Sequence, residues 1–304
     1  LAEQVAEFYP DLQDERFVSA FAIYHQRYST NTFPQWWLAQ PFRMLAHNGE
    51  INTLKGNLNW MKSHEIRMAS AAFGEMAEDI KPIVAHGASD SAALDAVFEV
   101  MVRAGRNAPM AKTMLIPEAW SKNGHTIPES WRAMYAYSNA VMEPWDGPAA
   151  ICATDGRWVV AGMDRNGLRP LRYVVTRDGL VVAGSEVGMV PARESDVVEK
   201  GRLGPGQMLA IDMVENRLLH DVEIKDELAD AQPFDQWIAT VTDIEAALAD
   251  VAEPALFAAG ELRRRQIAAG YSIEELEAIL HPMAEDSKEA VGSMGDDTPV
   301  AVLS

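Results

Sequence analysis

Polar side chains gather in three short segments of the sequence, each at the end of an apolar stretch where a rigid element could hold a site. An arginine such as Arg27 can bind a carboxylate through two parallel hydrogen bonds, and an aspartate such as Asp90 can bind an ammonium group. Asn48 and Gly49 can present a side-chain amide and a backbone N–H to a developing oxyanion. The segments are His25-Gln26-Arg27-Tyr28-Ser29-Thr30, His47-Asn48-Gly49-Glu50 and Ser89-Asp90-Ser91.

Together these residues suggest one composite site. Arg27 and Asp90 would read the two charged ends of an α-amino acid, while Asn48 and Gly49 would stabilise a tetrahedral intermediate. Each residue alone has a plainer interpretation: Arg27 as a surface charge, Asn48-Gly49 as a turn, and Asp90 as a helix N-cap. If the composite site exists, Arg27, Asn48 and Asp90 must converge on one pocket.

Motifs of other catalytic classes are absent from the sequence. The seven histidines show no metal-ligand spacing, and there is no P-loop, no dinucleotide fingerprint and no GxSxG motif. The glycine-rich run at 201–206 contains a proline and precedes an apolar run, which favours a tight turn over a phosphate cradle. Cys152, the single thiol, lies in an apolar run, where cysteine usually serves as a small buried hydrophobe. A different hydrolase that uses Cys152 remains an alternative.

Composition narrows the class of protein. The 304 residues allow one large domain or two smaller ones, and 48% hydrophobic with 23% charged residues is typical of a globular chain. No apolar run approaches the roughly 20 residues that a membrane-spanning helix needs. The net charge of −19 disfavours nucleic acid and anionic membranes as partners. One cysteine excludes an internal disulfide framework and any multi-cysteine metal site in this chain, which favours a cytoplasmic setting.

The first half of the sequence alternates predicted strands and helices. Residues 21–27 are apolar and aromatic without a helix cap, which predicts a strand. The apolar segment at 44–46 is expected to stop at Asn48-Gly49, a turn dipeptide. The spacing of apolar residues predicts helices at 54–61, 94–102 and 129–142. Ser89, Asp90 or Ser91 could each be the N-cap of the second helix.

From residue 148 the pattern changes to β-structure. Asp155-Gly156, Asp178-Gly179 and Glu215-Asn216 each separate two apolar runs, and Asp-Gly in this setting predicts a hairpin with a type I′ turn. Hairpins combined with separate helices predict an α+β fold with largely antiparallel sheets. After about residue 221 the sequence becomes helical and acidic. The C-terminal expectations are a buried helix face and a final strand, at Leu276, Ile279, Leu280 and 299–304.

The three polar segments and several longer motifs resemble those of one known family. The chain is similar to the N-terminal class II glutamine amidotransferase domain, of the Ntn-hydrolase kind, of glutamate synthase large subunits. The resemblance runs through essentially the whole sequence. The further motifs that carry it are Leu38-Ala39-Gln40-Pro41, Pro144-Trp145-Asp146-Gly147-Pro148, Asp164-Arg165-Asn166-Gly167-Leu168-Arg169-Pro170, Gly204-Pro205-Gly206 and Gly292-Ser293-Met294-Gly295-Asp296-Asp297.

The resemblance implies a role for each candidate residue. Arg27 would bind the α-carboxylate of glutamine and Asp90 its α-amino group. Asn48 and the Gly49 N–H would form the oxyanion hole. The pocket would be lined further by Tyr28 and Thr30.

The resemblance also implies the architecture and a missing group. The fold would be a four-layer αββα sandwich, here incomplete, over residues 1–231, followed by an acidic linker and the start of a central domain over 232–304. The nucleophile of the family is an N-terminal cysteine whose α-amine acts as the base, whereas residue 1 here is Leu1 and Cys152 matches no catalytic position. We therefore expect an internal fragment of a longer chain, inactive as a glutaminase by itself.

The parent reaction implied is transfer of the glutamine amide nitrogen to 2-oxoglutarate, with reductive formation of glutamate. Besides glutamine, the implied partners are the synthase domain of the same polypeptide and either a small NADPH-oxidising subunit or ferredoxin. FMN and an iron–sulfur cluster are implied for the full-length enzyme, and no cofactor or metal for this chain. The alternative is a non-catalytic glutamine-binding or regulatory module.

Overall fold

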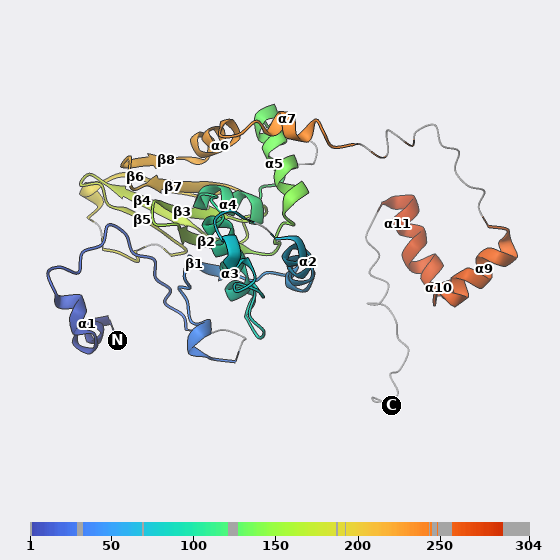
Figure 1. The fold of residues 1–304 in the computed structure, drawn as a ribbon, viewed down its shortest axis with the longest axis horizontal. Coiled ribbons are helices and arrows are strands. Elements are labelled where there is room, and N and C mark those ends of the chain that lie inside the picture. Colours follow the sequence, from blue (N-terminus) through green and yellow to red (C-terminus); the bar gives the residue numbers. More distant parts are fainter. Residues whose placement is uncertain are drawn as a thin grey trace. The chain divides into compact units, whose positions relative to one another are not determined.

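A computed structural model of the chain describes residues 2–28, 33–68, 70–120, 127–186, 188–191, 193–242, 244, 248 and 257–287 (Figure 1). The chain divides into two compact units, Leu1–Val241 and Thr242–Ser304. Three expectations from the sequence lie outside the described residues: the pocket residue Thr30, the motif at 292–297 and the strand at 299–304. The proposed domain boundary after residue 231 remains a prediction.

A five-stranded antiparallel sheet forms the centre of the first unit. Its strand order is β1-β2-β3-β7-β8, so β1 lies at one edge. Strands β2 and β3 are central and mostly buried, as expected for runs of alanine, valine and isoleucine. The bounds are β1 (Leu45–Gly49), β2 (Ala149–Thr154), β3 (Trp158–Met163), β7 (Met208–Asp212) and β8 (Arg217–Leu219).

A three-stranded antiparallel sheet, in the order β5-β4-β6, lies on one face of this sheet. Small apolar side chains of β2 and β3 fill the space between the two sheets, together with Leu171, Ala183 and Leu203. The bounds are β4 (Arg172–Thr176), β5 (Val181–Gly184) and β6 (Val197–Arg202).

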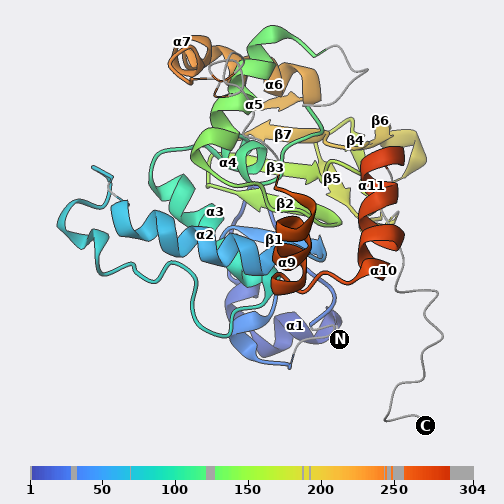
Figure 2. The same ribbon diagram turned by 90° about the vertical axis from the view of Figure 1, so that its right-hand side faces the viewer.

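Helices cover the opposite face of the five-stranded sheet (Figure 2). There α3 (Asp90–Arg103) packs on β1, α4 (Ala108–Leu115) on β3, and α6 (Asp221–Asp230) on β7. The main apolar core lies between these helices and the sheet. The other helices of the unit are α1 (Ala2–Phe8), α2 (Leu54–Arg67), α5 (Glu129–Val141), α7 (Phe234–Ile238) and 3₁₀ turns at Pro10–Gln13, Trp36–Leu38, Gly74–Ala77 and Glu194–Asp196.

These elements confirm the predicted α+β class and the three predicted helices, which are α2, α3 and α5. The helices and the two sheets supply three of the four layers of an αββα sandwich. The glycine-rich run at 201–206 is a turn only in its second part: Gly201 and Arg202 end β6, and the residues after them carry the chain to β7 in the other sheet.

The three predicted hairpins are present, but the turns of the two Asp-Gly hairpins differ from the prediction. Strands β2 and β3, β4 and β5, and β7 and β8 pair as expected. A type I′ turn needs positive φ at both central residues, and only Gly156 (φ 93°) and Gly179 (φ 90°) have it in the two Asp-Gly turns. The loops are longer than two residues, so a single left-handed glycine suffices to reverse the chain.

Two local predictions are wrong. Residues 21–27 form no strand, because a strand requires a second strand to pair with and no described strand pairs with this segment. Asn48-Gly49 is not a turn, because both residues pair with β2 and end strand β1. The turn signal of Asn-Gly is local and is overridden here by pairing with a strand a hundred positions away.

In the second unit the described residues form helices α9 (Ala259–Ala268), α10 (Ile273–Glu275), a π-helical turn at Leu276–Leu280 and α11 (His281–Asp286). The predicted buried face is wrong: Leu276 and Ile279 are half-buried and Leu280 is exposed. The described residues of this unit provide no second apolar layer to cover such a face.

Candidate active site

The site is built around strand β1, one of the two edge strands of the five-stranded sheet among the described residues. In antiparallel pairing, successive residues direct their N–H and C=O groups alternately toward the partner strand and away from it. Met44 and Glu50 bond toward β2, since Thr154 N–H donates to the Met44 carbonyl and Glu50 N–H to the Pro148 carbonyl, both at 2.9 Å. The odd-numbered residues between and beyond them therefore face the open edge.

Side chains accept most of the N–H groups along this open edge. Asp95 Oδ1 accepts from Leu45 N at 2.9 Å, Gln40 Oε1 from His47 N at 2.6 Å, and Asp90 Oδ2 from Ile51 N at 2.8 Å. For Gly49 no hydrogen-bond partner is found among the described residues. Its N–H is thus the one donor of this row that remains available to a ligand.

The backbone around Gly49 is too crowded for a side chain. A Cβ placed on Gly49 would lie 1.8 Å from the Pro148 carbonyl oxygen and 2.7 Å from Nε2 of His47. Gly49 has no positive φ. Glycine is therefore required here by close approach of another backbone rather than by a turn conformation.

Asn48 is half-buried and its carboxamide has no hydrogen-bond partner among the described residues. Asn48 pairs with Ala150, whose side chain lies in the cluster between the two sheets. Cross-strand partners share a face of the sheet, so the Asn48 side chain also lies on the face toward the three-stranded sheet. A free amide donor thus lies beside the free N–H of Gly49.

Asp90 is brought to the same strand by helix α3. Ser89 is the N-cap of this helix, since its Oγ accepts from Ala92 N at 3.2 Å. Asp90 is therefore not the cap, and its carboxylate turns instead to the chain that follows β1 at Ile51, while Ser91 Oγ donates to its Oδ1 at 3.3 Å. The carboxylate is half-buried, so it keeps a solvent-facing side that can bind a cation.

His47 lies buried directly before Asn48, with 2% of its surface exposed. Its Nδ1 shares a hydrogen bond of 2.7 Å with Ser91 Oγ, and for its Nε2 no hydrogen bond of good geometry is found among the described residues. Burial lowers the pKa of His47, opposed by the nearby charge of Asp90. The charges of Arg169 and His25 act in the same direction as burial, so both belong to the surroundings of His47.

Arg27 lies on an exposed segment without regular secondary structure. His25 Nδ1 donates to the Arg27 carbonyl at 2.7 Å. Tyr28 is exposed and its ring packs edge-on against Trp36 at 5.3 Å. The structure thus places the Asp90 carboxylate against Ile51, two residues after Gly49 on the strand that carries Asn48. Convergence of Arg27, Asn48 and Asp90 on one pocket remains a prediction.

Several residues around the site were not assigned a role from the sequence. Gln40 and Ser91 hold His47, and buried Asp164 accepts from Ala149 N at 2.8 Å, which fixes the β2 residue opposite Gly49. Both Gln40 and Asp164 belong to motifs that carry the family resemblance. Motif membership is thus the one sequence signal that marks them.

Cys152 lies in β2, where its side chain is partly buried between the two sheets. Burial raises the pKa of its thiol to about 11. At pH 8 only on the order of one thiol in a thousand is then ionised. We expect alkylation of Cys152 by iodoacetamide to be at least a hundredfold slower than that of free cysteine. Rapid alkylation, with loss of ammonia release in Cys152→Ala, would favour the hydrolase that uses Cys152.

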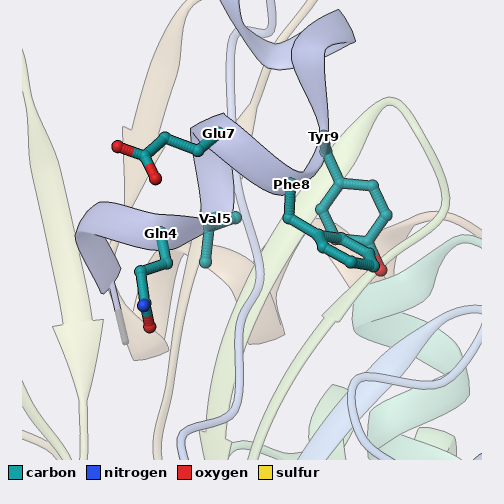
Figure 3. A pocket seen from close by; sticks show the side chains of 5 residues that line it. All are labelled: Gln4, Val5, Glu7, Phe8 and Tyr9. Carbon is teal, nitrogen blue, oxygen red and sulfur yellow. The ribbon is translucent and has the colours of Figure 1, made fainter.

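Other features of the described residues lie apart from this site. A shallow hollow is lined by residues of α1 and by Tyr9, which follows it (Figure 3). Among the described residues, no three His, Cys, Asp or Glu side chains are grouped to hold a metal ion. None of the helices in the described part is long and apolar enough to cross a membrane.

Comparison with known proteins identifies what the chain is similar to. Residues 1–237 match the family described as "Glutamine amidotransferases class-II", and residues 264–304 match "Glutamate synthase central domain". The large chain of NADPH-dependent glutamate synthase from Azospirillum brasilense is 61% identical over the whole of this chain, and that from Bacillus subtilis (strain 168) is 47% identical over 99% of it. The chain spans 20% of the length of each relative.

A ferredoxin-dependent glutamate synthase of Arabidopsis thaliana is 45% identical over the whole of this chain, which spans 19% of that relative. Among solved structures, the glutamine phosphoribosylpyrophosphate amidotransferase of B. subtilis is similar with a TM-score of 0.30 and 20% identity, over 58% of this chain and 28% of that one.

Proposed function

Because the chain belongs to the class II glutamine amidotransferase family, we propose that it reads glutamine and helps to release ammonia from it within a glutamate synthase large chain. The observation that carries the proposal is the pair of free donors at the end of β1, the Asn48 carboxamide and the Gly49 N–H. Asp90, an anion suited to the α-ammonium group of glutamine, is bonded to Ile51 two residues after Gly49.

The proposed chemistry is acyl transfer through a thioester. A thiolate adds to the amide carbon of glutamine, and the carbonyl oxygen becomes an oxyanion that accepts hydrogen bonds from Asn48 and Gly49. Collapse of this intermediate, with protonation of the nitrogen, breaks the C–N bond and releases ammonia. Water then adds to the thioester, and the same donors stabilise the second oxyanion before glutamate and the thiol leave.

The residues of this chain cannot supply the nucleophile of that scheme. Leu1 has no sulfur, and the thiol of Cys152 is kept protonated by burial. The attacking thiol is proposed to be an N-terminal cysteine of the complete enzyme, as the family resemblance implies. We therefore expect the chain by itself to bind glutamine without releasing ammonia, which an ammonia assay of the isolated chain tests.

The rest of the proposed reaction belongs to the complete polypeptide. Ammonia would pass to the synthase domain for reductive amination of 2-oxoglutarate, with electrons from NADPH or ferredoxin, the two donors named among the relatives. FMN and an iron–sulfur cluster are proposed for that domain. This chain does not fit such a cluster, because it has one cysteine and a cluster needs several thiolates.

Arg27 and Asp90 are proposed to bind the two charged ends of glutamine. In the complete enzyme we expect Arg27→Ala and Asp90→Asn each to raise KM for glutamine on the order of tenfold to a hundredfold, because each removes a charge-assisted contact. Activity with added ammonium chloride should persist, since free ammonia does not require glutamine to bind. Arg67→Ala, on the exposed end of α2, is the matched control. Equal loss with glutamine and with ammonium would contradict the assignment.

A further inference from the structure

We propose that Gln40 is a positioning residue: its carboxamide pairs with both backbone groups of His47 and so fixes the two oxyanion donors that follow, Asn48 and Gly49. The inference rests on the proposed function of those donors and adds to it a residue that touches neither substrate nor reacting atoms.

The contact between Gln40 and His47 has two hydrogen bonds. Gln40 Oε1 accepts from His47 N at 2.6 Å, and Gln40 Nε2 donates to the His47 carbonyl at 3.0 Å. A primary carboxamide presents the same donor and acceptor pair as a peptide group. Gln40 therefore acts at the open edge of β1 as a neighbouring strand would, but at a single residue.

The contact between Gln40 and His47 lies directly before the two donors, so it affects their position. On the β2 side, Asn48 is held by its pairing with Ala150. On the open side, Leu45 is held by Asp95 and Ile51 by Asp90, so Gln40 provides the contact between them, directly before the donors. An oxyanion donor must lie within about 2.7–3.1 Å of the oxygen, and sites of this kind tolerate errors of only about 0.5 Å.

His47, which Gln40 binds through its backbone, is also held through its side chain. The ring of His47 is buried and its Nδ1 bonds to Ser91 Oγ on α3, next to Asp90. Gln40 itself is half-buried, and its segment folds back on β1 through Phe42 N–H, which donates to the Leu45 carbonyl at 2.9 Å. His47 thus joins β1 to α3, the helix that carries Asp90. Gln40 fixes the position of the β1 backbone at His47.

The test is steady-state kinetics of the complete enzyme with Gln40→Ala and Gln40→Glu. Both variants should lower kcat for glutamine on the order of tenfold to a hundredfold, with KM within about threefold, since a misplacement near 1 Å can cost about a hundredfold in rate. Activity with ammonium chloride and the thermal unfolding temperature should stay at wild-type values. Gln207→Glu, the same chemical change in the turn before β7, is the matched control.

Gln40→Glu also allows a pH-dependent measurement: if Gln40 had only a structural role, the pH dependence of kcat would not change. Its carboxylate still accepts from His47 N–H but opposes the His47 carbonyl, whereas the protonated acid can donate to that carbonyl as the amide does. The ratio of variant to wild-type kcat should therefore rise toward one as pH falls from 8 to 5.5. A flat ratio, an unchanged kcat, or equal loss of ammonium-dependent activity overturns the role of Gln40. A wild-type enzyme that cannot use glutamine overturns the proposed function instead.

Discussion

Replacement of Asn48 by alanine in the complete enzyme is expected to lower kcat for glutamine hydrolysis on the order of 10²–10³-fold, with little change in KM. The carboxamide of Asn48 has no partner among the described residues, so it is free to donate to charge that appears only in the tetrahedral intermediate. An interaction made only in the transition state affects kcat and leaves ground-state binding unchanged. Release of ammonia, measured at several glutamine concentrations, separates the two constants.

The control for Asn48 is Asn52→Ala, since the Asn52 side chain is exposed in the chain that follows β1. This variant should keep wild-type kcat. A tenfold rise in KM for Asn48→Ala with unchanged kcat would make Asn48 a binding residue and would remove it from the oxyanion hole.

Gly49→Ala is expected to be the most destabilising single methyl addition in the site. The new Cβ would lie 1.8 Å from the Pro148 carbonyl oxygen, and both backbones are tied to the sheet, so neither can retreat without breaking pairs. We expect a loss of about 3 kcal/mol in the free energy of unfolding and loss of glutamine-dependent activity. Denaturant unfolding of the complete enzyme, followed by far-UV circular dichroism, measures the first quantity.

Gly56→Ala is the matched control for this substitution. Gly56 lies in α2 with nothing within 4 Å of the added Cβ. Alanine should stabilise the helix there by about 0.5–1 kcal/mol. Unfolding curves in which the two variants shift in the same direction would show that the approach of Pro148 does not constrain Gly49.

The helices and hairpins that were predicted correctly are each indicated by a pattern within their own segment of the sequence. The helix over 94–102 follows from apolar spacing, and the hairpin at Asp155-Gly156 from a turn dipeptide between apolar runs. These patterns involve neighbours a few residues apart. Their physical cause is therefore contained in the segment itself.

The predictions that were wrong, or never made, depend on distant partners. Asn48-Gly49 became a strand because β2 pairs with it about a hundred residues later in the chain. Asp90 turned toward Ile51 because Ser89 took the cap. The pairing of Gln40 with the backbone of His47 has no sequence pattern of its own, because any polar side chain at that place is equally typical of a loop.

The row of side chains along the open edge of β1 has a second effect, on association between molecules. An exposed strand edge can recruit a strand of another chain, which needs a free N–H at every second residue. Along β1 and the chain after it, Asp95, Gln40 and Asp90 already occupy the N–H groups of Leu45, His47 and Ile51. An incoming strand would find one donor, at Gly49, between the Gln40 carboxamide on one side and the Asp90 carboxylate on the other, and the carboxylate would repel its carbonyl groups. The arrangement that leaves a single N–H for a small oxyanion thereby protects the edge against aggregation.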